Sequence, residues 1–190
     1  HQAITISYRQ STQLNELAMG IMRLNGQNDG ASALPMGVDN QGVPPALAEH
    51  LSTTAEVATW LAERIREIEA FVKMLPSVAV LVMSEDDVQP LASLLSEQLA
   101  DNNIRAVACR EGQTMGKEND VRVFDIQHIK GLEFEAVFFI GVDRLATNQP
   151  GLFDKYLYVG STRAATYLGI TVDEVLPPTL EPLRKMFTSQ

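Results

Sequence analysis

Apolar runs alternate along this chain with stretches in which apolar residues recur every three or four positions. The segment from Val78 to Met83 is continuously apolar, a pattern typical of a parallel strand that is buried on both faces. Further strand-like segments occur at 3–7, 105–109, 121–126, 136–142 and 167–172. The pattern therefore predicts a sheet of several strands.

Helical periodicity fills the intervals between these strands. Apolar positions on one face predict a helix over about 12–24. Thr53 and Glu56 have the spacing of a capping box, which predicts the start of a long helix, and Pro76 is expected to close it. The apolar stripe of this helix is expected to comprise Val57, Leu61, Ile65, Ile68 and Val72.

Two more helices are predicted later in the chain. Ser84 and Asp87 are placed to cap a helix that runs through Leu99. The segment 152–165 is expected to form another helix, just before the last predicted strand. Strands that alternate with helices in this way predict an open α/β sheet, whose ligands bind at the carboxyl ends of the strands.

The remaining segments lack any period. Residues 25–51 are rich in Gly, Pro, Asn and Asp, and 111–119 are polar, so both are predicted to be loops. Pro177, Pro178 and Pro182 predict a loosely structured tail.

Composition narrows the class of protein. With 190 residues, 45% hydrophobic and 21% charged, the chain suits one ordinary globular domain. A single cysteine, Cys109, excludes an internal disulfide framework and suits a reducing cytoplasm, and no apolar run is long enough for a membrane span. The net charge of −9 argues against binding nucleic acid through a broad basic surface. Because the chain opens at His1 and enters a strand at once, we expect it to be a piece of a longer protein.

One candidate segment for chemistry lies between two predicted strands. Lys130 and Gly131 offer a cation beside a backbone that a ligand can approach closely. Glu133 follows, and its carboxylate is suited to accept hydrogen bonds from ribose hydroxyls, although a surface ion pair with Lys130 is an equally simple explanation. Gln127 and His128 precede them, with no serine–histidine–carboxylate pattern nearby.

Two arginines are further candidates. Tyr8 and Arg9 follow the first predicted strand, where an aromatic ring could stack on a base and a guanidinium could reach a phosphate. Arg163 follows a Gly-Ser-Thr turn and could stabilise charge on a transferring phosphoryl group. The chain has no G-x-x-x-x-G-K-[ST] loop, so half of a nucleotide site is predicted here and the other half elsewhere.

Three motifs together resemble the second RecA-like domain of superfamily 1 helicases of the UvrD/Rep type. These are Tyr-Arg at 8–9, Lys-Gly-Leu-Glu-Phe at 130–134 and Tyr-Val-Gly-Ser-Thr-Arg-Ala at 158–164. The resemblance implies a three-layer RecA-like fold over 1–175, with a mainly parallel sheet and no Walker A loop, followed by a tail over 176–190.

The resemblance also implies roles for the candidate residues. Tyr8 would stack on adenine, Glu133 would hold the ribose, and Arg9 and Arg163 would contact the γ-phosphate as the catalytic cations. Gln127 and His128 would lie towards single-stranded DNA. Lys130 and Gly131 would belong to the ATP side and shape the loop that links the two sites.

The implied activity is ATP-dependent translocation along DNA by a cytoplasmic protein, with ATP and Mg²⁺ as cofactors. An N-terminal RecA-like domain of the same polypeptide would supply the Mg²⁺ ligands. No metal site is expected within this chain, which by itself is expected to be inactive.

Two alternatives stay open. The spacing of about 120 residues between Arg9 and Lys130 leaves no room for the large inserted subdomain of UvrD and Rep. The shorter spacing resembles the HelD subgroup, whose members act on RNA polymerase. The other alternative is a non-catalytic interaction module, because Gln127 and Ala165 depart from the family pattern.

Overall fold

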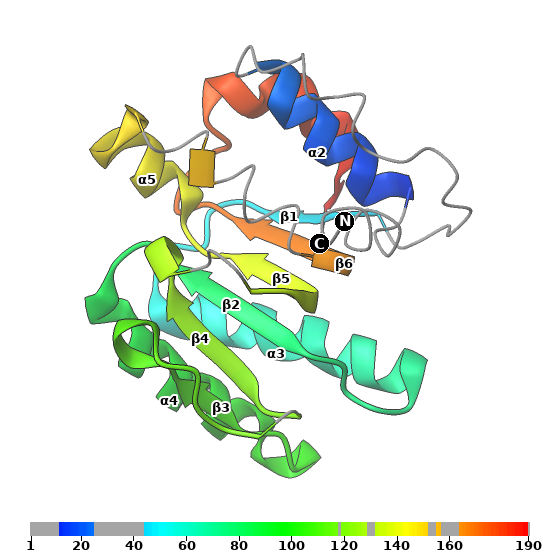
Figure 1. Cartoon of the computed structure of the whole chain (residues 1–190), viewed down its shortest axis with the longest axis vertical. Helices are drawn as coiled ribbons and strands as arrows, with labels where there is room; N and C mark the ends of the chain where they lie inside the picture. The colour runs from blue at the N-terminus through cyan, green and yellow to red at the C-terminus, as the bar shows by residue number, and fades with distance from the viewer. Residues whose placement is uncertain are drawn as a thin grey trace.

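The computed structural model describes residues 12–24, 44–117, 119–128, 132–151, 155–156 and 164–189. Within them, seven strands form one sheet in the order β3-β4-β2-β5-β6-β1-β7, and all pairings are parallel (Figure 1). The strands are β1 (Ala46–Ala48), β2 (Val78–Val82), β3 (Ala106–Ala108), β4 (Val121–Asp125), β5 (Phe134–Phe139), β6 (Ala164–Thr171) and β7 (Thr188–Ser189).

The strand β2 lies between β4 and β5, and all five of its residues are buried. Layers of helices cover the sheet on both faces, so a strand in this position has no side chain that can reach water. The prediction of a doubly buried strand is therefore confirmed over 78–82, while Met83 lies beyond the strand and is half-buried.

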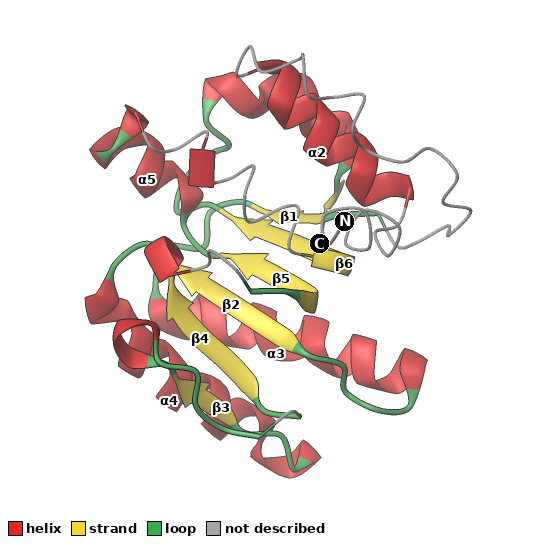
Figure 2. Ribbon diagram, viewed as in Figure 1, coloured by secondary structure: helices red, strands yellow, loops and turns green. Residues whose placement is uncertain are grey.

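Helices cover both faces of the sheet (Figure 2). One face packs against α3 (Thr54–Val72) and α4 (Val88–Leu99), and the other against α2 (Thr12–Leu24), α5 (Val142–Asn148) and the 3₁₀ segment η6 (Pro178–Met186). Each face has its own apolar core. The predicted three-layer α/β class is confirmed, as is the helix over 12–24. Among the described residues, no helix has the length and apolar character needed to cross a bilayer.

The start of α3 has the predicted capping box. The backbone N–H of Glu56 donates to Thr53 Oγ1 (3.1 Å), and Glu56 Oε1 accepts from the backbone N–H of Thr53 (3.2 Å). The hydrogen bonds from Thr53 lower the pKa of Glu56. The helix ends at Val72, before Pro76, because Lys73 adopts the left-handed conformation with φ 69°. Val72 was expected to belong to the apolar stripe, but it is 40% exposed and so is not part of the buried face of the helix.

Short 3₁₀ turns follow several strands. Ser84 caps η2 (Glu85–Asp87), and α4 begins directly after it and ends at Leu99 as predicted. The side chain of Asp87, which was expected to cap this helix with Ser84, makes no capping hydrogen bond. The other turns are η3 (Ala100–Asn102), η4 (Arg110–Gly112) and η5 (Ile126–His128). The turns after β2, β3 and β4 lie at the same edge of the sheet, since the strands are parallel.

The predicted loop over 25–51 contains a strand. β1 pairs with β6 on one side and with β7 on the other, and Leu47 and Ala48 are buried. Three residues are too few to show an alternating pattern, so no strand could be predicted here. Residues 25–43 of this loop, and the predicted strand over 3–7, lie outside the described residues.

The predicted helix over 152–165 extends too far. Ala164 and Ala165 already belong to β6, while Lys155 and Tyr156 are helical. The helix α5 lies earlier, because Gly141 ends the path of β5 with φ 69° and Val142 begins a helix where a strand was predicted. Both errors come from apolar residues whose short runs fit either kind of element.

The tail over 176–190 is not loosely structured. Leu180 and Leu183 of η6 are buried, and a Cβ on Gly20 of α2 would lie 2.9 Å from Leu183 Cδ2, so α2 and η6 are in contact. Arg184 donates two hydrogen bonds to Glu49 after β1, at 2.9 and 3.0 Å. Pro178 is the first residue of η6, a position that suits proline, and Pro182 lies inside the segment. The prolines therefore do not exclude regular structure here.

Candidate nucleotide and nucleic-acid site

Gln127 and His128 lie together in η5, directly after β4 at the carboxyl edge of the sheet. The side-chain amide of Gln127 donates to Asp125 Oδ2 (2.9 Å), and its backbone N–H donates to Asp125 Oδ1 (3.1 Å). Asp125 is buried and Gln127 is exposed. The strand end therefore fixes an exposed amide side chain at this edge.

His128 is half-buried against η2 and η4. Its Nε2 lies 3.9 Å from Glu85 Oε1, and its ring fills the space beside Gly112, where a Cβ would lie 2.9 Å from Nδ1. Gly112 has φ +80°, so a glycine suits this position both for its backbone and for its lack of a side chain. The position of the imidazole is thus set by two neighbouring turns.

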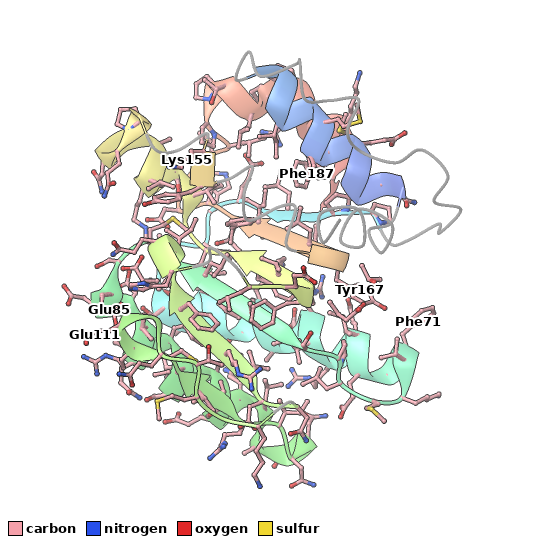
Figure 3. All side chains as sticks on the ribbon, viewed as in Figure 1. Phe71, Glu85, Glu111, Lys155, Tyr167 and Phe187 are labelled. Carbon is pink, nitrogen blue, oxygen red and sulfur yellow. The ribbon has the colours of Figure 1, made fainter. Side chains whose placement is uncertain are left out.

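Glu85 joins these turns at the same edge. Its Oε2 accepts a hydrogen bond from the backbone N–H of Glu111 (2.9 Å) and lies 3.5 Å from Nε of Arg110. Figure 3 shows Glu85 and Glu111 side by side at this end of the molecule. Glu85 belongs to none of the sequence motifs, and only its place directly after a buried strand could have suggested it.

A separate ionic group lies after β5 and β6 at the carboxyl edge. Arg144 lies 3.2 Å from Asp87 and 3.1 Å from Asp173. Burial raises the pKa of Asp173, and the cation of Arg144 partly offsets this effect. The backbone N–H of Asp173 donates to Asp143 (3.0 Å), so these charges mainly tie neighbouring loops together.

Glu133 lies at the opposite edge of the sheet. It is exposed and directly precedes Phe134, the first residue of β5. Since the strands are parallel, the start of β5 lies at the amino edge, whereas Gln127 and His128 lie at the carboxyl edge. Gln127 and His128 thus lie at the carboxyl edge, where ligands of such a sheet were expected to bind, whereas Glu133 lies at the amino edge.

The described ends of the connection between β4 and β5, at 126–128 and 132–133, therefore lie at opposite edges of the sheet. The connection leaves β4 and enters β5, which lie on either side of β2. The described part of this connection contains the 3₁₀ turn η5 and no α-helix. Lys130 and Gly131 belong to this stretch but lie outside the described residues.

The start of β6 lies beside the start of β5. Ala164, the first residue of β6, pairs with Phe134, the first residue of β5. Arg163 directly precedes Ala164 in sequence, just as Glu133 directly precedes Phe134, but Arg163 lies outside the described residues. Tyr8 and Arg9 lie outside them as well.

Two polar residues near this point were not among the predicted site residues. The hydroxyl of Thr166 donates to Glu135 Oε1 (2.8 Å), and both residues are half-buried. Burial and the Glu135 carboxylate raise the pKa of neighbouring Tyr167. Tyr167 lies at the end of the molecule opposite Glu85 (Figure 3). A second acidic residue, directly after Lys-Gly-Leu-Glu-Phe, was the available signal in the sequence.

A metal centre is not formed by the described residues. They contain no group of three or more His, Cys, Asp or Glu side chains placed to hold a metal ion. The part of the chain that the structure describes therefore offers no ready set of Mg²⁺ ligands.

Comparison with solved structures shows the fold. A structure described as the C-terminal domain of a possible DNA helicase from Lactobacillus plantarum WCFS1 has a TM-score of 0.67 and 17% identity, covering 95% of this chain and 97% of that one. A hypothetical ATP-dependent RNA helicase from Sulfolobus tokodaii has a TM-score of 0.51 and 13% identity, covering 100% of this chain and 56% of that one. The fold is that of a RecA-like helicase domain.

Comparison with family models is more specific than the comparison of folds. Residues 120–171 match the family model described as the UvrD-like helicase C-terminal domain. The matched range runs from the start of β4 to the end of β6, and so spans Gln127, His128, Glu133 and Arg163. The resemblance seen in the motifs is confirmed over this range. No curated protein sequence matches the chain.

Proposed function

We propose that the chain is the C-terminal motor domain of an ATP-dependent DNA helicase or translocase. One observation carries this proposal: the pairing of Phe134 with Ala164 brings the starts of β5 and β6 together within the range that matches the UvrD-like family. Glu133 and Arg163 directly precede these two paired residues. A ribose-binding carboxylate and a phosphate-binding arginine can therefore serve one nucleotide at this edge.

The ATP side of the site would consist of five side chains and a glycine. Glu133 would accept hydrogen bonds from the ribose, and Tyr8 would stack on the adenine. Arg9 and Arg163 would contact the γ-phosphate and stabilise the charge of the transition state, which is the role of an arginine finger. Lys130 and Gly131 would shape the approach of the connecting stretch to the nucleotide.

The second substrate would be single-stranded DNA at the carboxyl edge. Gln127 and His128 would contact it there, at the other end of the stretch 126–133 from Glu133. A movement of this stretch would couple ATP turnover at one edge to the hold on the strand at the other. ATP would be bound as its Mg²⁺ complex, and we expect an N-terminal RecA-like domain of the same polypeptide to provide the metal ligands.

The test is Arg163→Ala in the full-length protein. We expect ATP turnover to fall by about 10³-fold or more, the range known for arginine fingers, while ATP binding largely survives. Turnover should be measured with single-stranded DNA present, and binding with a fluorescent ATP analogue. Turnover equal to that of the unaltered protein would contradict the proposed role of Arg163.

The chain by itself gives a second test. The isolated domain is expected to show negligible ATPase activity, because no phosphate-cradling loop is encoded in it. Hydrolysis at a helicase-like rate by the isolated domain, lost on Arg163→Ala, would overturn this expectation. Co-purification of the full-length protein with RNA polymerase, without strand separation, would instead favour the HelD-like alternative.

A further inference from the structure

The start of β6 departs from the regular register seen in the other described pairings. Phe134 pairs with Ala164, but two residues further along β5, Ala136 pairs with Tyr167. Residues 165 and 166 of β6 therefore lie opposite a single residue, Glu135, which makes this a β-bulge. Bulges are rare between parallel strands, and they change the direction of the strand and of the side chains beside it.

Hydrogen bonds hold Glu135 from two sides. Its carboxylate Oε1 accepts from the hydroxyl of Thr166 (2.8 Å), and its backbone N–H donates to Ser77 Oγ (2.9 Å). The backbone N–H of Ala136 donates to the carbonyl oxygen of Ser77 (3.0 Å). Ser77 directly precedes β2, so Glu135 joins the starts of three neighbouring strands.

The hydrogen bond between Thr166 and Glu135 is charge-assisted. Both side chains are half-buried, and a hydrogen bond that a carboxylate accepts in such surroundings is stronger than one between neutral groups. The bond crosses from β5 to β6 at the bulge itself. It therefore fixes the path of β6 over the few residues that follow Arg163.

We propose that Glu135 and Thr166 are positioning residues for Arg163: their hydrogen bond holds the bulge at the start of β6, the strand that directly follows Arg163 in sequence, and ATP turnover through Arg163 depends on this start being held. The inference rests on the proposed function, since it gives Arg163 a part in ATP turnover. It assigns no contact with ATP to Glu135 or Thr166.

The expected effect follows from the geometry of catalysis. A displacement of about 1 Å of a positioned group can lower a rate by about 100-fold. Loss of the Thr166 hydroxyl should therefore reduce kcat for ATP hydrolysis by about 10- to 100-fold. The KM for ATP should change by less than about threefold, because groups outside the bulge hold the base and ribose in the proposed site.

The experiment compares three variants of the full-length protein. Thr166→Val keeps the β-branched shape and removes the hydroxyl, whereas Thr166→Ser keeps the hydroxyl. Ser96→Ala is the control for lost stability, because Ser96 Oγ bonds the backbone of Ala106 in the edge strand β3, at 2.8 and 2.9 Å. ATP turnover, KM and unfolding by urea are measured for each. If Thr166→Val does not fold, Glu135→Gln is used, which keeps the shape and weakens the acceptor.

The proposal requires a loss of kcat in Thr166→Val that Thr166→Ser restores and that Ser96→Ala does not show. Equal kcat in Thr166→Val and Ser96→Ala would overturn it, as would a loss expressed in KM alone. Arg163→Ala, measured alongside, separates the proposed role of Arg163 in ATP turnover from the positioning role of Glu135 and Thr166. If Arg163→Ala is inactive and Thr166→Val is normal, only the positioning role fails. If Arg163→Ala is fully active, both fail.

Discussion

Gly169 of β6 lies against the ring of Phe138 in the neighbouring strand β5. A Cβ at this position would lie 2.5 Å from Cδ1 of Phe138 and 3.1 Å from Cη2 of Trp60, which packs over both strands from α3. The two rings meet edge to face, with centroids 5.9 Å apart. The glycine is therefore required by the close approach of two aromatic rings, a need that no sequence pattern reveals.

Gly169→Ala is expected to destabilise the domain by about 1–3 kcal/mol, because the added methyl group overpacks this contact. The free energy of unfolding in urea measures the effect. Gly151→Ala is the matched control, since a Cβ on Gly151 would meet no atom within 4 Å. Equal stability of the two variants would show that the rings can move apart without cost.

Thr53→Ala should cost about 1 kcal/mol, because it removes the side chain that caps α3. Thr53→Ser keeps the hydroxyl and should retain most of the stability. Thr54→Ala, which changes an exposed residue of the same helical turn, serves as the control. Thermal unfolding distinguishes them, and the prediction fails if Thr53→Ala and Thr54→Ala unfold at the same temperature.

The ion pair of Glu49 with Arg184 should make stability depend on pH. The hydrogen bonds from Arg184 and from the backbone N–H of Leu176 lower the pKa of Glu49 from 4.5 to about 2. Since the pKa is lower in the folded state, the stabilisation is complete above pH 4.5 and is lost as the pH falls towards 2.

Glu49→Gln should therefore lower stability at pH 7 by about 1–3 kcal/mol and flatten the pH dependence between pH 5 and 3. Arg184→Gln should have a similar effect, because it removes the same pair. Urea unfolding at several pH values measures both. A Glu49→Gln variant with an unchanged slope over this range would contradict the assignment.

Gly112→Ala tests the position of His128. The added methyl group would collide with the imidazole, so His128 should be displaced. The alanine would also have to adopt φ +80°, which is strained for a residue with a side chain. In the full-length protein, both Gly112→Ala and His128→Ala are expected to weaken binding of a single-stranded oligonucleotide by several-fold, as the loss of one contact of about 1 kcal/mol implies. Fluorescence anisotropy measures this, with Gly151→Ala as the control. Unchanged affinity in His128→Ala would remove this residue from the proposed strand site.

Long, regular patterns in the sequence predicted the fold well. The apolar run of β2 and the capping box of α3 both correspond to single physical causes, burial on two faces and unsatisfied N–H groups. The short strand β1 could not be predicted, because its three residues become a strand only by pairing with segments far away in sequence. The burial of Leu180 and Leu183 could not be predicted for a similar reason, since they pack against α2, which is far away in sequence.

The sequence motifs named candidate residues, but they did not predict how the described ones are laid out on the sheet. The strand was expected to begin at Ala136, although β5 begins at Phe134 and includes Glu135. Glu135 enters the strand because Thr166 and Ser77 provide partners for its carboxylate and its N–H.

The short strand β7 closes one side of the sheet with the last residues of the chain. A truncation after residue 175 would leave the backbone groups of β1 open to strands from other molecules and would uncover apolar side chains of α2. Such a shortened protein would tend to aggregate during expression, even though it keeps every motif that links the chain to helicases. The boundary for producing this domain therefore belongs beyond Ser189.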